Sequence, residues 1–404
     1  MLSATCVGSI LWGSSLGSLS ETMLSFWERS ELLQADIVVV GGGFIGLWSV
    51  LECCRRYPRR RILLLERSAI PLGASTRNAG FATLGTVGEA LVHAQQVGEE
   101  VVASLMRERW LGIQQWRREF GDEALGYEAV GGYELVFAEE EHLCAAVEHC
   151  NLWLRELIGG DVFRDAPELV RRWGFPPHRV RSIIVNPYDG ALHPGKALAV
   201  LQNRVLQHGA FLWGGALVEA LEPTSEGIAI ACWDVVGKRL LDVRAQVVAV
   251  CTNAWIPQLL PQITDISPAR GQILLTAPLA RQPFPLGTYH FHAGYYYFRW
   301  VGRRLLLGGG RHRALQEEET YEFALNTALQ EHLEELLRTL LLPGTDVAIE
   351  QRWSGIMGMR PNKLPRVEYA GERIVVGFGC NGMGVALAPR IGTQVATLVG
   401  EWLS

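Results

Sequence analysis

Residues 35–66 read ADIVVVGGGFIGLWSVLECCRRYPRRRILLLE, and this stretch decides the fold. It opens with a short apolar, β-branched run, which is typical of a buried parallel strand. The pattern G-x-G-x-x-G follows, and then a helical stretch that ends near Pro58. A second apolar run ends at Glu66, which comes 20 residues after Gly46. This order predicts a dinucleotide-binding β-α-β unit in which Glu66 accepts hydrogen bonds from a ribose.

The glycine turn itself suits a pyrophosphate. Gly41 permits the tight turn, Gly43 lets the backbone approach the phosphates, and Gly46 lets the helix pack close to the strand. The helix that begins beside Phe44 and Ile45 has unpaired N–H groups and a partial positive charge at its first turn. These residues are therefore predicted to bind the cofactor.

Composition limits the class of protein. The chain has 404 residues, of which 49% are hydrophobic and 20% charged, so a disordered class is excluded. At roughly 150 residues per domain, two or three units are expected. The net charge is −5, which is not the basic footprint of a nucleic-acid-binding protein.

Cysteine usage and the N-terminal segment bear on the compartment. Eight cysteines are scattered without a CxxC pair, so no metal site is predicted and a reducing cytoplasm is expected. No apolar run of roughly 18 residues predicts a membrane span. Residues 1–22 contain no Lys or Arg, which a secretory signal would need. We expect residues 1–30 to be a disordered or partly ordered leader, or to reflect a start site misassigned upstream of Met23.

A second segment selects the cofactor. Residues 71–81 read PLGASTRNAGF and resemble the GAS-x-RN-x-G segment of the D-amino-acid oxidase family of flavoproteins, which includes the glycine and sarcosine oxidases. The resemblance implies FAD and covers most of the chain from residue 35 onward. Six more segments carry it in order and spacing, namely residues 190–195, 247–255, 270–272, 294–299, 353–355 and 379–385.

The resemblance implies an α/β fold with two domains. A Rossmann-like FAD-binding domain would comprise residues 31–125, 180–267 and 345–404. An α+β substrate domain with a mixed or antiparallel sheet would take residues 126–179 and 268–344. The sequence is consistent with this division because it predicts strands at 132–138, 295–300 and 305–307. It also predicts one long helix over 317–342, with the acidic residues 317–319 at its solvated start.

The resemblance also implies which residues contact the flavin. Val218 would hold the adenine edge, and the turn at Gly382 would direct N–H groups at the pyrimidine oxygen, where a helix N-terminus stabilises negative charge. FAD is expected to be non-covalent, because residues 353–357 lack the cysteine of covalent relatives. Besides the glycine motif and Glu66, the predicted cofactor-binding residues are Arg67, Ala74, Ser75, Arg77, Asn78, Ala79, Gly80, Val218, Thr252, Asn253, Gly382, Met383, Gly384 and Val385.

The implied reaction is hydride transfer from a CH–NH or CH–NH₂ carbon of an amino acid or amine to flavin N5. The cofactor carries this step, so the protein mainly orients the substrate. Tyr295 and Tyr297 are expected on one strand face, and Tyr295 matches a family position that binds a substrate carboxylate. Met357 stands where amino-acid-oxidising relatives have a carboxylate-clamping arginine, so Arg360 or Arg299 is the candidate for that role.

Two other interpretations stay open. A flavin-linked 2-hydroxy-acid dehydrogenase would need a general base, and His292 is the candidate. A non-catalytic flavin-binding subunit is the other. No lysine lies between Lys238 and Lys363, which favours a redox carrier over O₂ as electron acceptor, because some family oxidases keep a lysine near the flavin. The substrate's identity and the oligomeric state, a homo-oligomer included, also stay open.

Overall fold

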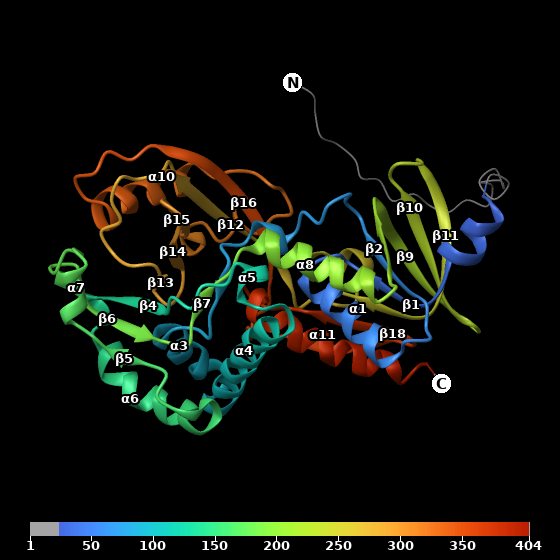
Figure 1. Ribbon diagram of the computed structural model, residues 1–404, viewed down its shortest axis with the longest axis horizontal. Coiled ribbons are helices and arrows are strands. Elements are labelled where there is room, and N and C mark those ends of the chain that lie inside the picture. Colours follow the sequence, from blue (N-terminus) through green and yellow to red (C-terminus); the bar gives the residue numbers. More distant parts are fainter. Residues whose placement is uncertain (1–23, 404) are drawn as a thin grey trace.

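The computed structural model describes residues 24–403, which form two large sheets joined side by side. In Figure 1 the first sheet lies to the right and the second to the left, with α4 between them. The prediction of a leader over residues 1–30 falls outside the described residues up to residue 23 and is not tested there; its last three residues belong to a helix. The first described element is a short π-helix, η2 (Glu28–Leu32).

The first sheet is built around the predicted β-α-β unit. Its order is β17-β18-β11-β1-β2-β8, with β1 parallel to both β2 and β11. β9 and β10 extend the long β11 in antiparallel fashion. The strands are β1 (Gln34–Val40), β2 (Ile62–Glu66), β8 (Phe211–Gly214), β9 (Ala216–Thr224), β10 (Gly227–Asp234), β11 (Arg239–Val250), β17 (Arg366–Gly371) and β18 (Ile374–Phe378).

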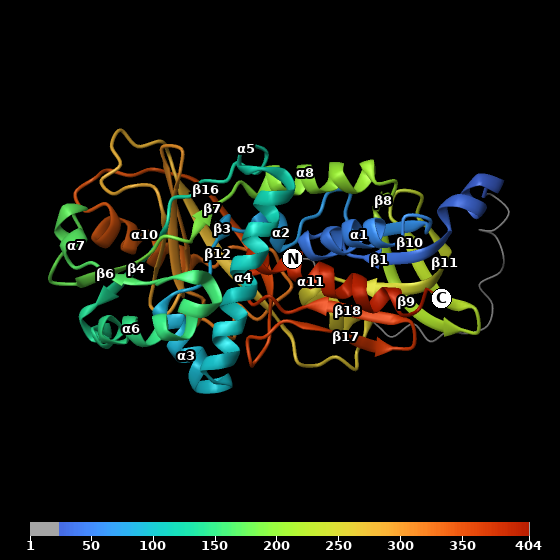
Figure 2. The same ribbon diagram turned by 60° about the horizontal axis from the view of Figure 1, so that its bottom comes forward.

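Helices α1 and α11 pack side by side against this sheet, with α4 and α8 beside them (Figure 2). Their close approach requires Gly392, where a Cβ would lie 2.6 Å from the Cβ of Trp48. Trp48 in turn meets Trp116 of α4 edge to face, with ring centroids 5.0 Å apart. These elements are α1 (Phe44–Arg56), α4 (Glu99–Phe120), α8 (Pro194–Gln207), η5 (Asn253–Trp255), α9 (Ile256–Leu259) and α11 (Gly384–Gly400).

The second sheet has the order β16-β12-β15-β14-β13-β4-β6-β5 and is antiparallel except for the pair β4–β13. Its strands are β4 (Gly132–Phe137), β5 (Arg164–Asp165), β6 (Val180–Asn186), β12 (Ser267–Thr276), β13 (Thr288–Phe291), β14 (Tyr296–Val301), β15 (Arg304–Gly309) and β16 (Ile349–Met359). One face packs on α7 (Glu168–Arg172), α10 (Thr327–Leu336) and η7 (Leu337–Leu341). The other face, which carries Ile273 and Tyr297, packs against Ala79 and Phe81 from the first unit.

Shorter elements connect the two sheets. β3 (Phe81–Ala82) pairs with β7 (Gly190–Ala191) in a two-stranded ribbon. The remaining helical segments are α2 (Ala74–Arg77), α3 (Val87–Val97), α5 (Asp122–Leu125), η3 (Ala138–Glu140), α6 (His142–Leu154), η4 (Arg155–Gly159) and η6 (Arg311–Arg313).

The predicted fold class is confirmed: a Rossmann-like α/β unit with a β-α-β start is joined to an α+β unit with a mixed, mostly antiparallel sheet. The strands do not follow the predicted division of the chain, however. β6 and β16 pair in the second sheet, although residues 180–186 and 349–359 were assigned to the FAD-binding domain. The local sequence of an apolar strand does not show which sheet the strand joins, because strand pairing depends on residues far away in the chain.

The predicted helix over residues 317–342 is wrong in its first third. α10 begins at Thr327, where the Asn326 side chain accepts the Leu329 N–H and caps it. The predicted solvated acid run is also wrong at its centre, because Glu318 is fully buried and pairs with Arg270 at 2.9 Å. The segment 311–326 therefore lies over β12 as an irregular strap, held by a buried ion pair.

None of the helices built from residues 24–403 combines the length and the apolar character that a bilayer crossing needs. Within the same residues, no group of three or more His, Cys, Asp or Glu side chains could hold a metal ion.

Candidate active site

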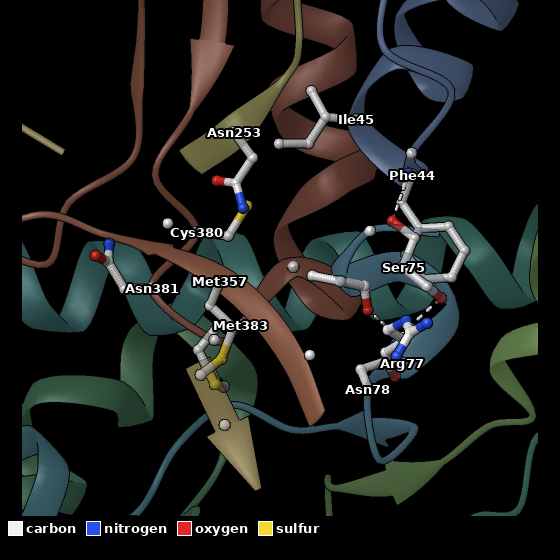
Figure 3. Close-up of a pocket in the computed structure, with 18 of the residues that line it drawn as sticks. Phe44, Ile45, Ser75, Arg77, Asn78, Asn253, Met357, Cys380, Asn381 and Met383 are labelled. Atoms are coloured by element: carbon white, nitrogen blue, oxygen red, sulfur yellow. Dashed lines mark hydrogen bonds between the residues drawn. The ribbon is translucent and has the colours of Figure 1, made fainter. Parts of the chain in front are cut away.

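A cavity of about 820 Å³ runs from the glycine turn after β1 to the second sheet. Its wall contains every predicted cofactor-binding residue except Gly46 and Gly80. In Figure 3, Phe44, Ser75 and Arg77 lie on one side of this space, and Asn253 and Cys380 lie on the other. The chain thus brings residues of four distant segments to one cavity.

The glycine turn leaves no room for side chains beneath it. Gly41 has φ +107°, and a Cβ there would lie 2.8 Å from the Cys251 carbonyl oxygen. A Cβ on Gly46 would lie 1.9 Å from the Gly41 carbonyl oxygen. Gly46 therefore acts from below the wall, by letting α1 cross β1 closely, as predicted from the motif.

Glu66 stands at the end of β2 with its carboxylate already oriented. One oxygen accepts the Gly42 N–H at 2.8 Å and the other accepts the Ser68 N–H at 3.1 Å. At the start of α1, the Phe44 N–H donates to the Ser75 hydroxyl at 2.9 Å (Figure 3). One of the helix N–H groups expected to face phosphates is thus bound by Ser75.

The segment after β2 is fixed by its own polar side chains. Asn78 donates to the carbonyls of Ala74 and Ser75 and accepts the Gly80 N–H. Arg77 donates to the Ser354 carbonyl at 2.9 Å, and its guanidinium lies 4.4 Å above the Phe323 ring. The side chains of Arg77 and Asn78 thus line the cavity wall and also hold its backbone in place.

Arg67 lies at the same end of the cavity. Its guanidinium is 4.1 Å above the ring of Trp255, which also lines the wall. Val218 lines the wall nearby, from β9. A cation stacked on an aromatic ring keeps its charge available to a phosphate or a ribose.

Several buried oxygens in the wall lack a partner. Among the described residues, the Thr83 hydroxyl, the Thr252 hydroxyl and the Asn253 amide oxygen accept or donate no hydrogen bond. All three residues line the cavity. Unpaired buried polar atoms are costly, so the wall suits a ligand rich in polar atoms, such as a dinucleotide.

The turn before α11 closes this end of the cavity. Gly382 has φ +89°, and the Met383 N–H donates to the Cys380 carbonyl at 2.9 Å. α11 then begins at Gly384 and runs for 17 residues, so its N-terminus faces the cavity with unpaired N–H groups. Such a terminus stabilises a partial negative charge on a bound group.

The second sheet supplies the opposite wall. His290, Tyr297, Gly308 and Ile273 are successive partners across β13, β14, β15 and β12. Gly308 has no side chain, and a Cβ there would lie 2.5 Å from the Tyr297 ring. The ring therefore lies flat over β15 and reaches toward Gly271, and burial raises its hydroxyl pKa.

The predicted substrate residues divide into two groups. Tyr295 and Tyr297 both line the cavity, although Tyr295 lies in the turn before β14 rather than on the strand. Arg299, Arg360 and His292 are not in the wall.

Each of these three side chains is engaged elsewhere. Arg299 donates to the carbonyls of Gly80 and Leu192, where burial lowers its pKa. The three-residue shift that would bring Arg360 into the role of Met357 does not occur, since Arg360 pairs with Asp265. His292 has φ +51° and pairs with Glu140 at 3.2 Å. These three side chains therefore do not line the cavity, and their contact with a substrate stays a prediction.

Three residues outside the predicted set line the cavity instead, namely His290, Arg311 and Lys363. Burial lowers the pKa of His290 to about 4, so its imidazole is neutral near pH 7. Strand alternation would place His290 and His292 on the same face, so it could not have chosen between them. What separates them is that β13 ends at Phe291, which leaves His292 in the following turn. Arg311 directly follows the glycines that end β15, which is the signal that could have found it.

Comparisons with known proteins agree with this geometry. The family model described as FAD dependent oxidoreductase matches residues 36–398. The gamma-glutamylputrescine oxidoreductase of Escherichia coli is 24% identical, over 93% of this chain and 85% of its own.

Two solved structures share the fold. Glycine oxidase from Geobacillus kaustophilus has a TM-score of 0.73 at 20% identity, covering 91% of this chain and 95% of that one. L-proline dehydrogenase from P. horikoshii has a TM-score of 0.71 at 19% identity, covering 91% and 94%.

Proposed function

Because this chain belongs to the family of FAD-dependent oxidoreductases, we propose that it oxidises the CH–NH or CH–NH₂ bond of an amino acid or amine. The product would be an imine, which water hydrolyses to a carbonyl compound. The observation that carries this proposal is one continuous cavity with the predicted FAD residues at one end and His290, Tyr295 and Tyr297 at the other. FAD supplies the hydride-accepting chemistry, so the task of these side chains is to bind and orient the substrate.

The electrostatics of the sheet wall favour an amine. His290 is neutral near pH 7, since burial lowers its pKa to about 4, and a neutral imidazole nitrogen can accept a hydrogen bond from an amine N–H. Tyr297 stays protonated, because burial raises its pKa. The wall thus offers neutral polar groups to the reacting end of a substrate.

The alternative 2-hydroxy-acid dehydrogenase is less well supported. Oxidation of an alcohol needs a base to take the hydroxyl proton. His292 points to Glu140 outside the wall, and His290, with its pKa near 4, is a weak base. The amine proposal needs no such base if the substrate binds as the neutral amine.

We further propose that FAD is held without a covalent bond. Among the described residues, the cysteines in the wall are Cys251 and Cys380, and burial raises the pKa of each to about 12. Their thiols are therefore protonated and unreactive near pH 7. Acid precipitation should leave all yellow colour in the supernatant, and yellow precipitated protein would contradict this.

The function is tested by adding substrates to the purified holoenzyme without oxygen and recording the flavin absorption bands. Amino acids, N-methylated amino acids and polyamines are compared with 2-hydroxy acids. We expect bleaching by one amine class and none by the hydroxy acids. Bleaching by hydroxy acids alone would favour the alternative, and no bleaching at all would favour a non-catalytic subunit. Readmitting air would then separate O₂ from a redox carrier as acceptor.

A further inference from the structure

We propose that Arg311 anchors a carboxylate of the substrate, so that the protein acts on amines that bear an acid group. This inference rests on the proposed function and names the substrate class of the same cavity. The anchor would come from the end of β15, and not from β16, where Met357 leaves an apolar surface.

The first argument is that the positive charge of Arg311 has no ion-pair partner among the described residues. Its side chain lines the cavity and is half-buried, yet it makes no hydrogen bond or ion pair with any residue in the range 24–403. Burial lowers its pKa, but a guanidinium stays charged throughout the physiological range. A partly desolvated cation without a partner favours an anionic ligand.

The other arginines of the wall either lie at the predicted FAD end or have an ion-pair partner. Arg67 and Arg77 are at the predicted FAD end, where they stack on the Trp255 and Phe323 rings. Arg109 pairs with Glu89 at 3.0 Å.

Lys363 acts on Glu89 through space. Burial acts to raise the pKa of Glu89, but Arg109 and Lys363 together lower it. Arg311 feels the carboxylates of Glu318 and Glu319 in the same way, but among the described residues its guanidinium, at the sheet end of the wall, has no ion-pair or hydrogen-bond partner.

The second argument is geometric. Tyr296 pairs with Gly309 in the β14–β15 ladder, and the Gly310 N–H donates to the Tyr295 carbonyl at 3.0 Å. The next residue, Arg311, is therefore beside the turn that carries Tyr295. A planar guanidinium next to a phenol hydroxyl matches the two oxygens of a carboxylate.

The third argument is that Arg311 is held in place by its own segment. The Ala314 N–H donates to the Arg311 carbonyl, and the Glu318 N–H donates to the Ala314 carbonyl at 2.9 Å. Glu318 is buried and pairs with Arg270, whose N–H donates to the Glu318 carbonyl at 2.8 Å. A backbone fixed in this way presents the guanidinium with little loss of conformational entropy on binding.

The test compares propionate with propionamide, which have the same shape and differ in charge. Each is titrated into the holoenzyme, and binding is followed by the change in flavin absorption and by calorimetry. The variants are Arg311→Met and Arg311→Lys, with Arg281→Met as the matched control, because Arg281 is exposed and outside the cavity wall. Thermal unfolding checks that each variant is folded.

We expect propionate to bind the wild-type protein more tightly than propionamide. Arg311→Met should weaken propionate binding roughly 10- to 100-fold, the range for a lost charge-assisted hydrogen bond. It should leave propionamide unchanged, and Arg311→Lys should retain part of the preference. Propionate that binds the Met variant within threefold of wild type, or binds wild type no better than propionamide, would overturn the inference.

A second comparison separates this inference from the proposed function. Alanine and ethylamine, which differ by the carboxylate, are added to the wild-type and Arg311→Met holoenzymes without oxygen. A fall in flavin reduction by alanine, with ethylamine unaffected, supports the anchor. Equal reduction by alanine in both proteins overturns the anchor while leaving amine oxidation in place. If no amine reduces the flavin, the proposed function fails, and the propionate titration still decides the role of Arg311.

Discussion

The burial of His290 should be visible in how the free energy of unfolding depends on pH. Its ring packs against Phe81, with centroids 4.9 Å apart, and burial lowers its pKa from 6.5 to about 4. In the unfolded chain the imidazole would take up a proton near pH 6.5. The unfolded state therefore binds more protons than the folded state between pH 6.5 and pH 4.

This residue should destabilise the fold in acid. As the pH falls through that window, His290 costs stability, and above pH 6.5 it contributes no pH dependence. We expect the free energy of unfolding of the wild-type holoenzyme to fall roughly 3 kcal/mol more than that of His290→Gln between pH 7 and pH 4. Urea denaturation at both pH values measures this. His208→Gln, an exposed histidine, is the control, and identical pH dependence in all three proteins would contradict the expectation.

At the scale of elements, the strap 311–326 was the least predictable part of the chain. Its acidic run, with the apolar periodicity that follows, looks like a helix start, and the tertiary contact with Arg270 overrides that local preference. Gln272 and Asn326 also donate to the Glu318 carboxylate. Such a network depends on residues some 46 positions apart, which no local pattern reveals.

Glu318→Gln should destabilise the fold far more than Glu319→Gln does. It leaves the Arg270 guanidinium buried without a counter-charge, and breaking a buried pair costs about 3 kcal/mol or more. We expect a clear drop in the midpoint of thermal unfolding and a raised KM for acid-bearing substrates, since Arg311 begins the same segment. Glu319→Gln, one position away and exposed, should change neither. Equal midpoints for the two variants would show that the strap does not depend on this ion pair.

The contrast between the two ends of the cavity explains how much the sequence could predict. The glycine turn, Glu66 and the segment around Ser75 were predictable because backbone geometry demands those residue types at fixed spacing. Arg360 and Arg299 lie outside the wall, which the sequence could not indicate, because it does not show which internal acids and carbonyls, such as Asp265 and Gly80, engage a guanidinium first.

On the scale of the whole molecule, binding of the cofactor depends on how closely α1 crosses β1. Gly46 does not line the cavity, yet a Cβ there would overlap the carbonyl oxygen of Gly41, which does, at 1.9 Å. The division into an FAD-binding domain and a substrate domain at the predicted boundaries stays a prediction. The pairing of β6 and β16 in the second sheet shows that the chain passes between the units near those boundaries.

Gly46→Ala should therefore weaken FAD binding from outside the site. Overpacking of this crossing costs about 1 to 3 kcal/mol, which corresponds to roughly 10- to 100-fold in the FAD dissociation constant. Ultrafiltration and the fluorescence of released FAD measure it. Gly371→Ala is the matched control, because Gly371 is outside the cavity wall and a Cβ there would meet only Ile374, at 3.9 Å. Unchanged FAD affinity in the Gly46 variant would contradict the role of this crossing.

The sheet wall of the cavity owes its hollow to absent side chains at Gly271, Gly309 and Gly355. A Cβ on Gly271 would sit 3.3 Å from the flexible end of Met357. A Cβ on Gly309 would instead sit 2.1 Å from the Tyr295 carbonyl oxygen, and one on Gly355 would sit 3.0 Å from the Cβ of Arg77. A single carbon atom could thus be added at Gly271 with only a small shift of Met357, whereas Gly309 and Gly355 are held by close neighbours. Substrate choice in this scaffold is therefore open to adjustment during evolution at one point of the sheet wall, while the nucleotide-binding turn tolerates no such drift.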